Sequence, residues 1–109
     1  FDYRGVVSGN DPRTMWRGLH TVDSLPNVVN PRSGYVFNVN DAPWPAAGRG
    51  TLDPKRFPAY MDQFGWNART THALALLDGT HKFTAEGLRA AAYDTANPAF
   101  DLILPPLFK

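Results

Sequence analysis

Apolar and polar residues alternate most clearly over residues 34–40, and this alternation predicts a β-strand. Side chains in a strand point alternately to its two faces, so one face of this strand is apolar. The opposite face ends in two side-chain amides, those of Asn38 and Asn40. A weaker alternation over residues 16–22 predicts a second short strand.

A long loop separates the predicted strands from a helical region. Residues 41–58 contain four prolines and two glycines, and the fixed φ of proline makes such a loop irregular but stiff. Loops of this length often carry function. Apolar residues three and four apart predict helices over residues 67–77 and 84–96, and Thr84 is a favourable N-cap for the second. Apolar residues 100–107, which contain two prolines, predict either one more helical turn or an extended tail.

The 109 residues fit a single partial domain, residues 1–109. Ten prolines and nine glycines accompany few aliphatic residues, a composition that would fold alone only marginally and favours a part of something larger. The formal net charge of +1 gives no electrostatic reason to expect nucleic acid or an anionic membrane as a partner. No apolar run approaches the roughly 20 residues that cross a bilayer. The absence of cysteine excludes disulfides, zinc–thiolate sites and thiol catalysis.

Simple catalytic motifs are absent from the sequence. None of the three serines lies in a G-x-S-x-G nucleophile motif, and the three histidines lack the spacing of metal ligands. The pair Asn38 and Asn40 stands out, because a buried amide without a hydrogen bond costs roughly 1–3 kcal/mol. On composition alone, a structural interpretation is favoured, in which both side chains cap turns and bond to loop backbone groups. The alternative is a functional site on this face of the strand.

The sequence from Asn30 to Pro43 reads N-P-R-S-G-Y-V-F-N-V-N-D-A-P. It resembles, at every position, the pattern N-P-x-x-G-[YF]-[VI]-x-N-x-N-[DN]-x-P of the penicillin acylase family of N-terminal nucleophile (Ntn) amidohydrolases. That family includes penicillin G, cephalosporin and acyl-homoserine lactone acylases. Further matching elements occur in the family's order along nearly the whole chain: Trp16-Arg17-Gly18, Leu25-Pro26, Arg69, Leu74-Ala75-Leu76-Leu77, Phe83-Thr84-Ala85-Glu86 and Asp101 to Leu107. The chain departs from the pattern at residues 70–73, where family members usually have a second arginine.

The resemblance implies an α+β fold, as a segment of the Ntn-hydrolase αββα sandwich, and amide hydrolysis as the activity. In this family the side-chain amide of the second asparagine of N-x-N, here Asn40, stabilises the tetrahedral oxyanion. Loss of one such donor typically lowers turnover by ~10²–10³. The resemblance also implies that Arg69 braces the polar network of the active site and that Asn38 and Trp44 line the substrate cleft.

The nucleophile of the family is a serine at the N-terminus of the β chain, with its own α-amino group as the base. Phe1 cannot perform this chemistry. We therefore expect the nucleophile upstream of this segment, and we expect residues 1–109 to be inactive alone. The implied partners are the rest of an acylase α/β heterodimer and a small-molecule amide. The sequence Asn-Asp-Ala-Pro-Trp at 40–44 favours the cephalosporin and acyl-homoserine lactone branch, and therefore a β-lactam or N-acyl-homoserine lactone substrate.

The resemblance also bears on metal binding and location. Some family members bind Ca²⁺ through an aspartate in the loop after N-x-N, and Asp53 is the nearest candidate here. The surrounding sequence differs from the family's, so we expect no metal and no other cofactor. The implied location is periplasmic or secreted, and the segment itself carries no targeting signal. The implied substrates are typical of antibiotic conversion or quorum quenching.

The alternative function is a stand-alone, non-catalytic binding or interaction module derived from this fold. Such a module would hold a ligand or a partner chain through its aromatic and arginine side chains. It would unfold cooperatively as an isolated chain of residues 1–109. A segment of a larger sandwich would show a weak transition or would associate, because its sheet edges and helix faces lack their partners.

Overall fold

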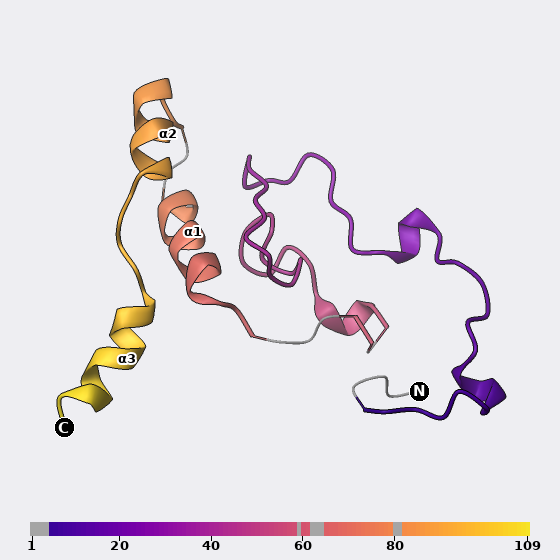
Figure 1. Cartoon of the computed structure of the whole chain (residues 1–109). Helices are drawn as coiled ribbons and strands as arrows, with labels where there is room; N and C mark the ends of the chain where they lie inside the picture. The colour runs from indigo at the N-terminus through magenta and orange to yellow at the C-terminus, as the bar shows by residue number, and fades with distance from the viewer. Residues whose placement is uncertain (1–4, 59, 62–64, 80–81) are drawn as a thin grey trace.

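A computed structural model of the chain describes residues 5–58, 60–61, 65–79 and 82–109. These residues form three α-helices: α1 (Ala68–Asp78), α2 (Ala85–Ala92) and α3 (Ala99–Leu107) (Figure 1). Three short 3-10 helices precede them: η1 (Pro12–Thr14), η2 (Val22–Ser24) and η3 (Pro54–Arg56). The described residues contain no β-strand. No helix in these ranges combines the length and the apolar character that crossing a membrane requires.

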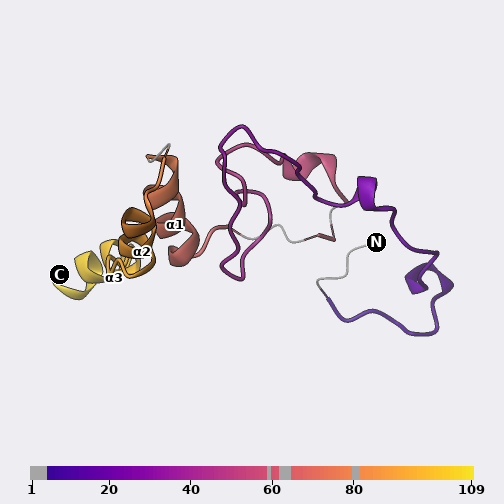
Figure 2. The same ribbon diagram turned by 90° about the horizontal axis from the view of Figure 1, so that it is seen from above.

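The molecule is extended and thin. Its radius of gyration is 18.3 Å, whereas a compact chain of this length would have about 13 Å. Its accessible surface is 9091 Å², against about 6000 Å² for a compact monomer of this size. In both views the segment with η1 and η2 lies at the opposite end of the molecule from the three α-helices (Figures 1 and 2). Apolar side chains along this segment, such as Trp16 and Leu19, are therefore exposed.

No strand forms over residues 34–40, so this prediction is wrong. A strand needs a continuous ladder of backbone hydrogen bonds to a neighbour. The described part of the chain supplies one such bond here, from the Phe37 N–H to the Ala46 carbonyl oxygen at 2.8 Å. At Asn40 the backbone turns to a φ of +54°, which ends the extended segment.

Residues 16–22 also form no strand, and the second strand prediction is wrong as well. Gly18 has a φ of +122°, which lies outside the β region, and η2 begins at Val22. No described segment pairs with this one. The regular elements in the described ranges are therefore helical rather than α+β. The αββα sandwich consists of packed β-sheets, and within the described residues neither residues 16–22 nor residues 34–40 have a strand to pair with. The sandwich therefore stays a prediction.

α1 follows the helix predicted over residues 67–77 with a shift of one residue. Asn67 is its N-cap, and the Asn67 Oδ1 accepts a hydrogen bond from the Thr70 N–H at 3.0 Å. This bond satisfies one of the free donors of the first turn. Thr70 and Leu74, one turn apart, are fully buried, so this face of α1 is packed against the rest of the molecule.

α2 begins where the predicted N-cap places it, since the Thr84 Oγ1 accepts from the Gly87 N–H at 3.0 Å. It ends at Ala92, earlier than the predicted residue 96. The Asp94 Oδ1 accepts from the Ala96 N–H at 2.9 Å, and this local turn competes with the helix. The apolar segment that follows is helical rather than an extended tail, and α3 holds its two prolines in the last turn.

The long loop, residues 41–58, folds back on itself and holds most of the buried apolar residues. Ala42, Trp44 and Ala47 are buried, and Trp44 stacks on Phe57 with ring centroids 5.5 Å apart. The prediction of a long, irregular, proline-rich loop is confirmed. Its centre lies beside α1 (Figure 1), and this brings the start of the loop to the N-terminus of that helix.

Candidate functional site

The two asparagines singled out in the sequence form a tight turn just before the loop. The Asn38 Oδ1 accepts a hydrogen bond from the Asn40 N–H at 2.8 Å, as is typical of turns built on asparagine. Asn40 has a φ of +54°, a conformation that asparagine tolerates better than most residues. The two amides therefore do not share a strand face. The Asn38 oxygen caps a turn, as the structural interpretation predicts.

The side-chain amide of Asn40 is exposed and free of internal hydrogen bonds. Both asparagines are exposed, and within the described residues the Asn40 side chain has no hydrogen-bond partner. An exposed amide N–H on a defined turn can donate to a ligand oxygen without breaking an internal bond. This is the property needed in a donor to a developing negative charge.

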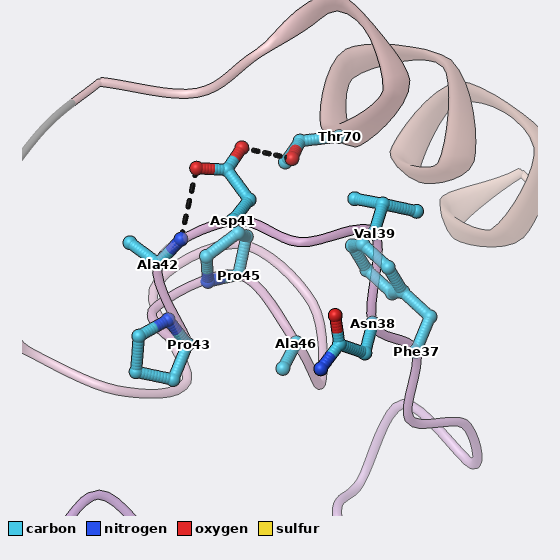
Figure 3. A pocket seen from close by; sticks show the side chains of 9 residues that line it. All are labelled: Phe37, Asn38, Val39, Asp41, Ala42, Pro43, Pro45, Ala46 and Thr70. Carbon is cyan, nitrogen blue, oxygen red and sulfur yellow. Dashed lines mark hydrogen bonds between the residues drawn. The ribbon is translucent and has the colours of Figure 1, made fainter. Parts of the chain in front are cut away.

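A small pocket lies beside this turn (Figure 3). Its volume is about 90 Å³, far below the roughly 300–1000 Å³ of typical ligand pockets. Nine residues line it: Phe37, Asn38, Val39, Asp41, Ala42, Pro43, Pro45, Ala46 and Thr70. The pocket is too small for a whole acylated molecule, and residues of both the turn and the loop line it.

Asp41 fastens the turn to the first turn of α1. Its Oδ1 accepts from the Ala42 N–H at 2.8 Å, and its Oδ2 accepts from the Thr70 hydroxyl (Figure 3). The Oδ2 also accepts from the Asn67 N–H at 2.8 Å. Burial raises the pKa of the Asp41 carboxyl, but these hydrogen bonds and the charge of Arg69 outweigh it and hold the pKa below its ordinary value. The carboxylate is therefore charged at neutral pH while it is bound to α1.

Two further predicted site residues lie close to this arrangement. Arg69 is exposed on α1, and its positive charge reaches the Asp41 carboxylate. Its role in bracing the polar network of an active site stays a prediction. Trp44 is only 7% exposed and stacks on Phe57, so its ring belongs to the core of the loop in this structure. The contact of Trp44 with a substrate also stays a prediction.

Asp53, the nearest calcium candidate, caps η3. Its Oδ1 accepts from the Lys55 N–H at 3.0 Å. Across the described ranges, no group of three or more His, Asp or Glu side chains is arranged to hold a metal ion. The expectation that no metal binds stays a prediction.

A second set of contacts ties the segment before the asparagines to the other end of α1. The Tyr35 hydroxyl donates to the Asp78 Oδ1, and the Asp78 Oδ2 lies 3.3 Å from the Arg49 Nε. The Arg49 guanidinium lies over the Trp66 ring, 4.9 Å from its centroid. Burial, together with the hydrogen bond and charge of Asp78, raises the pKa of Tyr35 to about 12 against the opposing charge of Arg49. Both ends of α1 are therefore bonded to the segment that carries the asparagines.

Sequence reasoning missed the supporting residues of this site. In the sequence, Asp41 occupies the [DN] position of the family pattern, but nothing there indicates that it bonds to a helix. A local signal does exist, because Asn67 and Thr70 have the spacing of an N-cap and its partner, and a helix N-terminus attracts a carboxylate. Which carboxylate binds there depends on the tertiary structure, so no spacing in the sequence identifies Asp41.

A family model described as penicillin amidase matches residues 2–109 of this chain. The matched range includes the turn at Asn38 and Asn40, the whole loop and all three α-helices. The family assignment that rests on residues 30–43 is therefore confirmed.

Proposed function

The chain belongs to the penicillin amidase family of amidohydrolases, and on that premise we propose that it forms part of an acylase in which Asn40 stabilises the oxyanion. The reaction is hydrolysis of the amide bond of an acylated small molecule. One observation carries this proposal. The Asn40 amide is exposed and unbonded within the described residues, on a turn that the next residue, Asp41, fastens to α1.

Amide hydrolysis places negative charge on the carbonyl oxygen of the substrate when the nucleophile adds to its carbon. The Asn40 Nδ2–H would donate to that oxygen, with a backbone N–H elsewhere in the enzyme as the second donor. A neutral amide donor gains most when the charge develops, so it stabilises the transition state more than the substrate. A turn held by hydrogen bonds reduces the reorganisation that this donation requires.

The nucleophile in this proposal is the N-terminal serine of the family's β chain, with its own α-amino group as the base. Ser8, Ser24 and Ser33 do not fit that role, because each is joined through its backbone nitrogen to a preceding residue and has no free α-amino group to act as the base. We assign the nucleophile to none of residues 1–109, and these residues alone are inactive. The rest of an acylase α/β heterodimer supplies the nucleophile and is the protein partner of this chain.

The substrate class is proposed from the residues that follow the asparagine. The sequence at 40–44, Asn-Asp-Ala-Pro-Trp, resembles the cephalosporin and acyl-homoserine lactone acylases. We therefore propose a β-lactam or an N-acyl-homoserine lactone as the substrate, with Asn38 and Trp44 near the cleft. A periplasmic or secreted location accompanies this proposal. No cofactor is assigned.

The open shape of the molecule favours a segment of a larger enzyme over a stand-alone binding module. Large apolar side chains are exposed at both ends of the described chain, including Trp16, Leu19, Leu102 and Ile103. A monomer rarely leaves so much apolar surface uncovered. Packing against the rest of an acylase would cover these side chains.

Substitution of Asn40 in the enzyme that carries this chain tests the proposal. Asn40→Ala removes the donor, and kcat is expected to fall by ~10²–10³. Autoprocessing and folding should remain largely intact, which a denaturing gel and a thermal unfolding curve would check. Near-normal turnover in Asn40→Ala would contradict the proposal.

A further inference from the structure

We propose that Asp41 and Thr70 are positioning residues for Asn40, a role that rests on the proposed function. Neither side chain touches the reacting atoms. Asp41 follows Asn40 in the chain, and Thr70 holds Asp41 from α1. Both act by fixing the turn from which the Asn40 amide projects.

The N-terminus of α1 bonds to the residues on both sides of Asn40. The Asn67 Nδ2 donates to the Val39 carbonyl oxygen at 3.5 Å, and the Asn67 N–H donates to the Asp41 Oδ2 at 2.8 Å. Asn40 lies between these two attachment points and has a φ of +54°. Its backbone therefore cannot rotate freely unless at least one of these bonds breaks.

Thr70 supplies the buried part of this attachment. Its side chain is fully buried, and its hydroxyl donates to the Asp41 Oδ2. Valine has nearly the same shape but no hydroxyl, so Thr70→Val would leave a partly buried carboxylate oxygen with one donor fewer. The Asn67 N–H and the Ala42 N–H would still hold Asp41, so the turn would loosen rather than unfold.

Loosening matters because the contribution of an oxyanion donor depends on its position. A misplacement of about 1 Å can lower turnover by ~10². The Asn40 side-chain amide projects from the backbone between Val39 and Asp41, and the Asp41 carboxylate anchors the second of these residues to α1. A change at Thr70 should therefore reach the reaction only through Asn40.

The first experiment compares two neighbouring threonines of α1 in the whole enzyme. Thr70→Val is expected to lower kcat about tenfold, since one charge-assisted hydrogen bond is lost, and to leave KM within about twofold. Thr70→Ser keeps the hydroxyl and should retain most of the turnover. Thr71→Val is the matched control, because Thr71 is exposed and its hydroxyl donates to the Asn67 carbonyl oxygen rather than to Asp41.

The second experiment repeats Thr70→Val in the Asn40→Ala background, at an enzyme concentration that makes residual turnover measurable. A positioning role predicts no further loss of kcat there. An equal loss of kcat in both backgrounds would mean that Thr70 acts independently of Asn40 and would overturn the inference. Equal effects of Thr70→Val and Thr71→Val would overturn it as well. Wild-type kcat in Thr70→Val beside a defective Asn40→Ala would overturn this inference alone. Near-normal turnover in Asn40→Ala would overturn the proposed function as well.

Discussion

The fully buried Thr70 hydroxyl donates a hydrogen bond to the Asp41 carboxylate, 29 residues earlier in the chain and directly after Asn40. At the other end of the same helix, Asp78 accepts from the Tyr35 hydroxyl. α1 is thus the support for the segment that carries the asparagines. Changes at either end of the helix should alter that segment.

Removal of the Asp41 carboxylate should destabilise the enzyme. Asp41→Ala leaves the Asn67 N–H without its acceptor, and leaves the Thr70 hydroxyl with only its longer bond to the Asn67 Oδ1 at 3.4 Å. A buried donor without an acceptor costs about 1–3 kcal/mol. Urea unfolding of the enzyme should show a loss in this range. Asp53→Ala is the matched control, because the Asp53 carboxylate also accepts from a backbone N–H close by in the chain, that of Lys55, but in an exposed 3-10 turn. Equal losses in the two variants would contradict the anchoring role of Asp41.

Acid should weaken the contact between Asp41 and α1. The pKa of Asp41 is lowered in the folded state, below the roughly 3.9 of an unfolded aspartate. Its contribution to stability is therefore complete above the unfolded pKa and is lost as the pH falls through the folded pKa. Below about pH 4, the free energy of unfolding should fall more steeply in the native enzyme than in Asp41→Asn. Parallel pH curves for the two proteins would show that Asp41 contributes nothing through its charge.

The helices were predictable from sequence where the decisive contacts are local. Asn67 and Thr84 cap the helices that follow them within three residues, so spacing alone locates both helix starts. The end of α2 was predicted too late, because the Asp94 turn competes with the helix. Local apolar spacing does not measure that competition.

The turn at Asn40 was not predictable in the same way. Alternation of apolar and polar residues predicts a strand only if another segment pairs with it, and the described chain supplies one backbone bond there. The turn depends on Asp41, which bonds to a helix 26 and 29 residues away. The motif identified Asn40, but the residues that hold it came from the tertiary structure.

The Tyr35 hydroxyl should ionise with a pKa of about 12 in the folded enzyme. Burial raises its pKa first, followed by the hydrogen bond and the charge of Asp78. The folded pKa exceeds the pKa of roughly 10 of an unfolded tyrosine. The protonated Tyr35 hydroxyl therefore contributes fully to stability below about pH 10, and this contribution is lost as the pH rises through the folded pKa. The ultraviolet absorbance of the native enzyme and of Tyr35→Phe is measured as a function of pH. The difference between the two curves reports the ionisation of the Tyr35 hydroxyl. Asp78→Asn should lower the pKa of Tyr35, and an unchanged value would contradict the assigned contact.

The turnover of Asn40→Gly tests the central claim most directly. Glycine keeps the left-handed backbone without strain, so this variant removes the amide donor and leaves the turn accessible. Asn30→Gly is the matched control, because Asn30 is also an exposed asparagine with a positive φ, at +50°. The proposed role of Asn40 predicts a kcat lower by ~10²–10³ in Asn40→Gly and a kcat close to that of the native enzyme in Asn30→Gly. Equal turnover in the two variants would contradict it.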